Sequence, residues 1–424
     1  MLRSLKTNLY FFIASYFKFF ATIQLALWKP RIIVITGSNG KTTTLHLIEA
    51  QLQGKARYSH HANSSFGIPF DILGIQRVTF AHLEWFRLFF QAPIRAFKAP
   101  YKENIYVVEA DCDRPGEGDF LSSLLKPEVV IWMSSARTHS QNFDRLVTEK
   151  THKNVDEAIA QEFGYFVERA TQLVIANIDN ELIKKQLKRA SAKCVEISEG
   201  PDLERYEVTA HHSHFRIREE DFSVRFLLPQ ESFYSLEAVS RLVHYLDMEL
   251  DTHFLKLNLP PGRSSILKGI KGTTIIDSTY NANLASVAAV LGMVAKLPSE
   301  KKWLVLGDLI EQGQEESEEH EKLAELVVAQ DFQGIILVGP RLTEHTYPLL
   351  RTHTEKEGTL LAFINPKEAL DFLEKNLKGG EVLIFKGARF LEGIIEHLLE
   401  NKEDVAKLCR QEPVWQARRK QWGL

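Results

Sequence analysis

The amino-acid sequence predicts an α/β protein: a central domain built on a mostly parallel sheet, followed by a smaller α/β domain. Short apolar runs recur along the chain, separated by segments long enough for a helix. This pattern is typical of parallel strands that are buried on both faces. One early run leads into a glycine-rich turn that opens a helical segment. At 424 residues the chain is long enough for two or three domains.

Residues 1–30 are predicted to form a hydrophobic N-terminal helix. Its apolar part, residues 9–28, is about long enough to span a bilayer. Lys18 at its middle would cost roughly 3 kcal/mol on insertion, so we expect a helix that is packed on the protein or lies in a membrane interface. A spanning helix is the second alternative. The polar residues that form one stripe of this helix are Asn8, Ser15, Lys18 and Thr22. The basic residues that flank the segment are Arg3, Lys6, Lys29 and Arg31.

The central domain is predicted over residues 31–297 and the C-terminal domain over 298–424. The boundary rests on "KLPSEKK" (296–302), whose composition is typical of a linker. Alternating apolar and polar residues over 193–229 predict antiparallel strands. The buried strands expected before the boundary are 31–36, 104–110, 128–133, 172–177 and 273–278. "WLVLGD", "GIILVG", "LLAFIN" and "EVLIFKG" are the strands expected after it.

Charge and cysteine usage exclude some classes of protein. The net charge of -3 argues against a general nucleic-acid binder. The three cysteines are far apart and form no CxxC pair, so neither a disulfide framework nor a cysteine zinc site is expected, as in proteins of a reducing compartment. Five histidines, His60, His61, His211, His212 and His214, show no ligand spacing and are expected to be surface or strand residues.

The stretch "IIVITGSNGKTTTLHLIEA" begins at residue 32 and predicts a phosphate-binding loop. Backbone N–H groups of such a turn cradle phosphate, a lysine adds positive charge, and a threonine hydroxyl can hold Mg²⁺. A turn that only caps the helix is the alternative, but strand, turn, Lys-Thr and helix together favour nucleotide binding. The candidate ATP-binding residues of the loop are Gly37, Ser38, Asn39, Gly40, Lys41, Thr42 and Thr43.

A series of motifs resembles the Mur ligases and their relatives, the folylpolyglutamate synthetases. "ITGSNGKTTT" is similar to their ATP loop, and "VVEADCDRPGEGDF" to a Glu-x-Gly-Ala…Pro-Gly-Glu segment. The other similar segments are "NSSFGIP", "SSARTHSQNF", "NIDN", "PGRSSIL", "IIDSTYNANLAS", "VLGDLIEQG" and "FKGAR". They run in the expected order from residue 31 to about residue 392. Within the family, the Tyr-Asn-Ala-Asn and Gly-Asp-x-x-Glu-x-Gly signatures resemble the branch that adds a terminal dipeptide.

The resemblance implies an ATP-dependent, ADP-forming amide ligase of cell-wall peptide precursor synthesis. It implies an acyl phosphate attacked by an amine, with ATP and Mg²⁺ as cofactors, and a Rossmann-like C-terminal domain. The expected substrate is a peptidyl nucleotide-sugar or a lipid-linked equivalent, in the cytoplasm or at the inner face of the membrane. Peripheral membrane contact through residues 9–28 and a partner subunit belong to this hypothesis. The alternatives are an ATP-binding scaffold with impaired catalysis and an amidase-type or polyglutamate-type ligase. A kinase or simple NTPase would explain only the loop.

Roles for individual residues also follow from the resemblance. Thr42, Glu109 and His139 are the implied metal ligands. Lys41, His139, Lys153 and Lys386 are the implied catalytic residues. Further ATP contacts are implied for Asn177, Arg263, Asp277, Asn281 and Asp308, and substrate contacts for Asn63, Ser64 and Arg389.

Three of the departures from the family pattern bear on the metal site, the ATP site and the substrate. The family's carbamylated lysine falls on Lys153 when counted from His139, but on Gln161 or Phe163 when aligned from "NIDN". Ser278 replaces a usual aspartate, which leaves Asp277 alone. About 30 residues precede the strand of the ATP loop, fewer than the ~50 that a domain gripping the UDP-sugar would need; we expect the hydrophobic helix to stand in its place.

Overall fold

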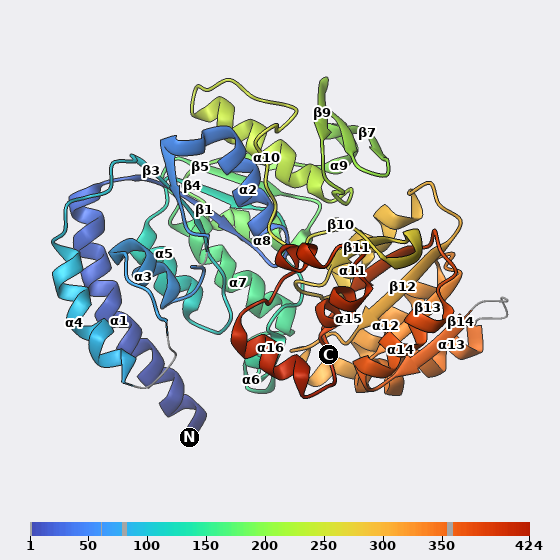
Figure 1. The fold of residues 1–424 in the computed structure, drawn as a ribbon. Helices are drawn as coiled ribbons and strands as arrows, with labels where there is room; N and C mark the ends of the chain where they lie inside the picture. Colours follow the sequence, from blue (N-terminus) through green and yellow to red (C-terminus); the bar gives the residue numbers. More distant parts are fainter. Residues whose placement is uncertain (1, 61, 79–82, 354–358) are drawn as a thin grey trace. The chain divides into compact units, whose positions relative to one another are not determined.

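The computed structural model describes residues 2–60, 62–78, 83–353 and 359–424. The chain folds into two compact units (Figure 1). The first contains residues 1–202 and 234–257, and the second contains residues 203–233 and 258–424.

A six-stranded sheet forms the centre of the first unit, in the order β2-β3-β1-β4-β5-β6. All five strand pairs are parallel, as the continuous apolar runs predict. The strands are β1 (Arg31–Thr36), β2 (Ala56–Tyr58), β3 (Ile105–Glu109), β4 (Val129–Trp132), β5 (Leu173–Asn177) and β6 (Lys193–Ile197). The carboxyl ends of β1, β3 and β4 therefore meet at one edge, where α/β proteins bind ligands.

Helices cover the sheet and close its apolar core (Figure 1). Trp132, Tyr106, Phe163 and Phe17 are among the largest fully buried side chains. The helices of this unit are α1 (Leu2–Trp28), α2 (Lys41–Leu52), α3 (Gly67–Leu73), α4 (Glu84–Ala96), α5 (Glu117–Leu125), α6 (Asp144–Thr148), α7 (Val155–Glu168), α8 (Glu181–Gln186) and α9 (Glu199–Asp202), and α10 (Ser232–Tyr245) lies almost wholly within it.

Within the first unit, one face of the N-terminal helix α1 packs against α3, α4 and α5. Ala14, Phe17 and Ala21 on that face are fully buried. Lys18 also points toward the protein: its Nζ donates hydrogen bonds to the Phe120 carbonyl at 2.8 Å and to Ser123 Oγ at 2.6 Å. Burial is the main reason why the pKa of Lys18 lies below its ordinary value. By length and composition, Thr7–Trp28 is the one helix among the described residues that could cross a membrane.

The expectation of antiparallel strands over 193–229 is wrong at its first strand. β6 pairs in parallel with β5, from Lys193 opposite Leu173 to Ile197 opposite Asn177. Its alternating sequence reflects its position at the edge of the sheet, where most of its side chains remain partly exposed. The following strands β7 (Leu203–Val208), β8 (Ser213–Ile217) and β9 (Glu220–Val224) do form an antiparallel sheet.

The second unit contains that small sheet and a six-stranded sheet in the order β10-β11-β15-β12-β13-β14. Among the pairings of the six-stranded sheet, only β10–β11 is antiparallel. The strands are β10 (Ser265–Lys268), β11 (Thr274–Ser278), β12 (Lys302–Gly307), β13 (Gly334–Val338), β14 (Thr359–Phe363) and β15 (Val382–Lys386). The helices are α11 (Leu284–Ala295), α12 (Glu316–Val328), α13 (Tyr347–His353), α14 (Pro366–Asn376), α15 (Leu391–Leu398) and α16 (Pro413–Lys420).

The second unit begins earlier than the predicted boundary at residues 297/298. β11 pairs with β15 along its whole length, so it belongs to the second sheet. The segment 296–302 is therefore a connection between α11 and β12 inside one unit, and its linker-like composition is that of an ordinary helix-to-strand loop. The chain passes between the units near residues 202, 233 and 257.

Candidate active site

The phosphate loop lies between β1 and α2, as predicted. Gly37 has a φ of 119°, and a Cβ at this position would lie 2.5 Å from the Ser134 carbonyl oxygen. Gly40, which precedes the first turn of α2, has a φ of 83°. Only glycine adopts such angles without strain. The two glycines therefore let the loop turn sharply and direct its backbone N–H groups at the start of α2.

Hydrogen bonds fix the loop to the segment that follows β4. Ser38 Oγ donates to the Ala136 carbonyl at 2.6 Å, and it accepts a hydrogen bond from the Ala136 N–H. The Asn39 N–H donates to Ser134 Oγ at 2.7 Å. Thr43 is half-buried on the first turn of α2. A loop held by these hydrogen bonds is preorganised to receive an anion at the helix N-terminus.

Lys41 is buried and forms an ion pair with Asp111, with 2.9 Å between Nζ and Oδ2. Its Nζ also donates to the Gly37 carbonyl at 2.5 Å. Burial lowers the pKa of Lys41, but the carboxylates of Asp111 and Glu109 more than offset this, so the pKa lies above its ordinary value. The ammonium group is thus charged at neutral pH, as a phosphate ligand requires.

Thr42 and Glu109, two of the implied metal ligands, are in direct contact. Thr42 Oγ1 donates to Glu109 Oε2 at 2.8 Å. Glu109 ends β3, and its backbone N–H donates to Ser59 Oγ at 3.0 Å. The hydroxyl comes from the first turn of α2 and the carboxylate from the end of β3, and together they offer oxygen ligands beside the loop.

His139, the third implied ligand, contacts Asp113, with 3.3 Å between Nε2 and Oδ1. Each of Asp111, Asp113 and His139 offers one ligand atom, and these three atoms lie within 4.8 Å of one another. His139 has a φ of 50°, in the left-handed region that costs energy for a residue with a Cβ. The strained backbone turns the imidazole toward the two carboxylates, and this set of donors fits a divalent cation.

Buried carboxylates support this acidic cluster from behind. Glu117 accepts hydrogen bonds from the Ser65 N–H and hydroxyl and from the Asp113 N–H. Glu162 on α7 accepts the N–H groups of Gly116 and Gly118 at the start of α5. Burial raises the pKa of Asp113, and the neighbouring charge of Asp111 raises it further. Crowded carboxylates of this kind gain most from a bound cation.

The structure does not bring a lysine from α7 to this cluster. Lys153 precedes α7 and its side chain is exposed. Gln161 is exposed and contacts His152, with 2.8 Å between Oε1 and Nε2. Phe163 is fully buried, 6.0 Å from the Trp132 ring. The two positions on α7 thus hold an amide that faces solvent and a ring that belongs to the core.

Three further predicted site residues of the first unit form hydrogen bonds with backbone groups of neighbouring loops. Asn177 Nδ2 donates to the Met133 carbonyl at 2.9 Å, and its Oδ1 accepts the Asp179 N–H. The Asn63 carbonyl accepts the Asp111 N–H at 2.8 Å. Ser64 Oγ accepts the Gly67 N–H. These contacts order the loops around the phosphate loop and the acidic cluster.

In the second unit, Lys386 lies among other predicted ATP-site residues. It ends β15, and its Nζ donates to the Asn281 carbonyl at 2.6 Å. Burial and the nearby charge of Arg263 lower the pKa of Lys386 to about 7, although Asp277 opposes the shift. Asp277 is fully buried, and its Oδ1 accepts the N–H and hydroxyl of Thr279.

Asp308 and Arg389, also in the second unit, form an ion pair with 2.6 Å between Oδ2 and Nε. The Leu342 N–H donates to Asp308 Oδ1, and Arg341 lies 3.6 Å from Oδ2. Arg389 has a φ of 75°. Asp308 thus fixes an arginine whose backbone is strained, an arrangement that recurs at ligand sites.

Asp111 and Asp113 are the functional candidates that the sequence prediction missed. Asp111 stands where the resembled Glu-x-Gly-Ala motif has glycine. The signal was the acidic alternation of Glu109, Asp111 and Asp113 directly after a predicted strand. The contacts of Asp111 with Lys41 and of Asp113 with His139 depend on how the strands pair, which the motif alone does not give.

The candidate site combines a lysine-bearing phosphate loop, a hydroxyl and a carboxylate beside the loop, and a carboxylate–histidine cluster at the same edge of the sheet. These features define a class of ATP-using enzymes that activate a carboxylate. Residues 35–231 match the Mur ligase middle domain, and residues 262–389 match the Mur ligase, glutamate ligase domain. The chain belongs to the Mur ligase family, whose members are ATP-dependent amide ligases.

Individual relatives agree with this placement. The UDP-N-acetylmuramoyl-tripeptide–D-alanyl-D-alanine ligase of Borreliella burgdorferi is 26% identical over 372 residues, which are 84% of this chain and 72% of that protein. The Bacillus subtilis ligase of the same name is 23% identical over 383 residues, 88% of this chain and 76% of that protein. MurF ligase from Thermotoga maritima, solved in complex with ADP, has a similar fold with a TM-score of 0.71 and 20% identity, covering 93% of this chain and 84% of that one.

Proposed function

We propose that this chain joins a peptidyl carboxylate to an amino acid or dipeptide in the synthesis of a cell-wall precursor. In this reaction a carboxylate oxygen of the first substrate attacks the γ-phosphorus of ATP, which forms an acyl phosphate and releases ADP. The amine of the second substrate then attacks the acyl carbon, and phosphate leaves as the amide forms. The observation that supports the proposal most strongly is the charged Lys41 beside three carboxylates at the phosphate loop.

In the first unit, the phosphate loop supplies the proposed nucleotide contacts. Residues 37–43 would bind the β- and γ-phosphates through backbone N–H groups and Lys41. Arg263, Asp277, Asn281 and Asp308 are assigned to ATP as the resemblance implies, and Arg389 to the substrate. Lys386, which has a pKa of about 7, would contact the acyl phosphate in its protonated form.

The residues of the first unit fit Mg²⁺, because oxygen donors dominate the available ligands. Thr42 and Glu109 would hold one ion beside the phosphate loop. Asp111, Asp113 and His139 would hold a second one, and the two aspartates would provide the negative charge that a carbamylated lysine supplies in the family. Bound Mg²⁺ neutralises charge on phosphate oxygens. Lys153, which is exposed, has no assigned contact in this arrangement.

The test is an incubation with ATP, Mg²⁺, UDP-N-acetylmuramoyl-tripeptide and D-alanyl-D-alanine, the substrates named for the relatives. ADP release should depend on both the carboxylate substrate and the amine substrate, and a product with the mass of the joined species should appear. His139→Ala should lower the rate, and His397→Ala, an exposed histidine on α15, should leave it unchanged. ATP binding without turnover across a panel of carboxylates and amines would contradict the ligase and support a scaffold.

We also propose that α1 and α4 contact an anionic membrane surface. The two helices lie side by side (Figure 1), and Tyr16 Oη donates to the Phe89 carbonyl across them. Their outer sides expose large apolar side chains, with Phe12 at 77% and Phe90 at 73%. The other exposed apolar side chains are Leu9, Phe19 and Leu27 on α1, and Phe86 and Ile94 on α4, with Phe97 at its C-terminal end.

Basic residues border this apolar surface. Arg87 and Arg95 on α4, and Lys29, Lys98 and Lys102 nearby, are at least partly exposed. Phenylalanine inserted below lipid headgroups, with cations at the headgroup level, is the pattern of interfacial helices. The position would place the ligase beside a lipid-linked substrate.

Flotation with vesicles tests this contact. The chain should float with vesicles of phosphatidylglycerol and phosphatidylcholine, and less with phosphatidylcholine alone. Phe86→Ser with Phe90→Ser should abolish flotation, whereas Val414→Ser with Leu255→Ser, which removes exposed apolar residues elsewhere, should not. Equal flotation of both double variants would refute the assignment.

A further inference from the structure

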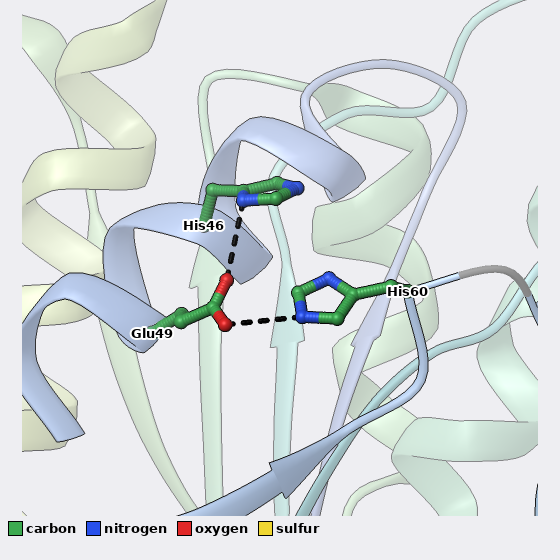
Figure 2. Close-up of side chains that lie close together, drawn as sticks. All are labelled: His46, Glu49 and His60. Atoms are coloured by element: carbon green, nitrogen blue, oxygen red, sulfur yellow. Dashed lines mark hydrogen bonds and ion pairs between the residues drawn. The ribbon is translucent and has the colours of Figure 1, made fainter. Parts of the chain in front are cut away.

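A second group of metal-ligating side chains lies outside the candidate active site, on the solvent side of α2. His46 and Glu49 are three residues apart on α2 and therefore share one face of the helix. His60 follows β2 and reaches the same carboxylate (Figure 2). The sequence prediction of His60 as an ordinary surface residue did not include His46 or Glu49, because their approach to His60 depends on the fold.

Both imidazoles point at the Glu49 carboxylate, each toward a different oxygen, as Figure 2 shows. His46 Nδ1 lies 3.3 Å from Glu49 Oε2, and His60 Nε2 lies 3.0 Å from Glu49 Oε1. The two ring centroids are 5.1 Å apart. One ligand atom from each of the three residues lies within 4.8 Å of the others.

We propose that His46, Glu49 and His60 bind a divalent transition-metal ion of the zinc type. Zinc ligands at about 2.0–2.1 Å in a tetrahedron are about 3.3 Å from one another, so only small side-chain movements would close this site around an ion. Two imidazoles and one carboxylate favour Zn²⁺, Co²⁺ or Ni²⁺ over Mg²⁺ and Ca²⁺, which prefer oxygen. All three side chains are partly exposed, so an ion can enter from solvent with water as a fourth ligand.

The position of the site gives the ion a structural consequence. α2 carries Lys41 and Thr42 in its first turn. Residues on either side of His60 are hydrogen-bonded to the backbone of two candidate site residues, since Ser59 Oγ accepts the Glu109 N–H and the Asn63 carbonyl accepts the Asp111 N–H. A metal ion would therefore cross-link the helix of the phosphate loop to the segment beside Glu109 and Asp111.

Zinc binding by the full-length chain tests the proposal without any nucleotide. The chain is titrated with Zn²⁺ against a fluorescent chelator, in excess Mg²⁺ so that oxygen-rich sites are occupied. We expect one site that His46→Ala, Glu49→Gln and His60→Ala each weaken at least tenfold. His139→Ala and the exposed control His397→Ala should retain it, because neither contributes to the proposed site.

Two further measurements separate binding from a folding defect. Zn²⁺ should raise the melting temperature of the parent chain but not that of His60→Ala, and circular dichroism should confirm that the metal-free variants are folded. Co²⁺ should produce the visible absorption bands of four-coordinate cobalt only when all three residues are present. Zinc affinity that is the same in the parent chain, His46→Ala and His60→Ala would overturn the proposal, as would the absence of zinc binding by the parent chain.

Discussion

Lys386 gives the most quantitative prediction, because its buried ammonium group links stability to pH. Its pKa falls from 10.5 to about 7 in the folded chain, a difference that corresponds to about 5 kcal/mol. The unfolded chain still binds this proton between these two pH values, whereas the folded chain has lost it. The free energy of unfolding should therefore rise with pH through this window, and the contribution of Lys386 should be flat below it.

Replacing Lys386 with Met removes the proton while it keeps the length of the side chain. The slope of the linkage is about 1.4 kcal/mol for each pH unit. Integrated between pH 7.5 and 9.5, this linkage should stabilise the parent chain by about 2.5 kcal/mol relative to Lys386→Met. The loss of the hydrogen bond to the Asn281 carbonyl costs about 1 kcal/mol at all pH values, so it shifts the curves without changing their slopes.

Urea unfolding at a series of pH values measures this difference. Far-UV circular dichroism follows both units, and the buried Trp303 of β12 contributes a fluorescence signal from the second unit. Lys375→Met, which removes an exposed lysine on α14 of the same unit, is the control and should run parallel to the parent chain. Parallel curves for Lys386→Met and the parent chain would refute a depressed pKa at this site.

Four other predictions concern candidate ATP-site and metal-site residues in the two units. Asp111→Asn should tighten ATP binding in EDTA several-fold in calorimetry, because the carboxylate no longer competes for Lys41; unchanged or weaker binding would contradict that competition. The pKa of Asp113 is raised, so its carboxylate should become protonated at a higher pH than that of an ordinary aspartate. Mg²⁺ affinity should therefore begin to fall at that higher pH as the solution is acidified, and Asp113→Asn should remove this pH dependence. Asp308→Asn should destabilise the second unit by about 3 kcal/mol in urea, because Arg389 loses its buried partner; a change below ~1 kcal/mol would be inconsistent with that pairing. Lys41→Ala should abolish ATP binding, and retained affinity would remove the phosphate-loop assignment.

The phosphate loop could be predicted from the sequence because its determinants are local. Gly37, Gly40, Lys41 and Thr42 are adjacent in the chain, and their conformations follow from glycine at positive φ and from the start of a helix. The parallel strands could be predicted for a similar reason, since continuous apolar runs require burial on both faces.

The contacts between strands could not be predicted in the same way. Asp111 reaches Lys41 because β3 lies beside β1, and nothing in either segment alone states that order. The boundary at residues 297/298 was wrong because a helix-to-strand loop and an interdomain linker have the same composition. The prediction that residues 193–197 form an antiparallel strand was wrong. An edge strand of a parallel sheet is partly exposed, so its sequence can alternate between apolar and polar residues as that of an antiparallel strand does.

The fate of oxygen in the proposed reaction tests the central claim most directly. The carboxylate substrate is labelled with ¹⁸O and incubated with the chain, ATP, Mg²⁺ and the amine substrate, and the released phosphate is analysed by mass spectrometry. If the carboxylate is activated as an acyl phosphate, one ¹⁸O atom should pass from the substrate to each phosphate that accompanies amide formation. Release of unlabelled phosphate would mean that water attacks ATP directly, and this result would contradict the assignment as a ligase.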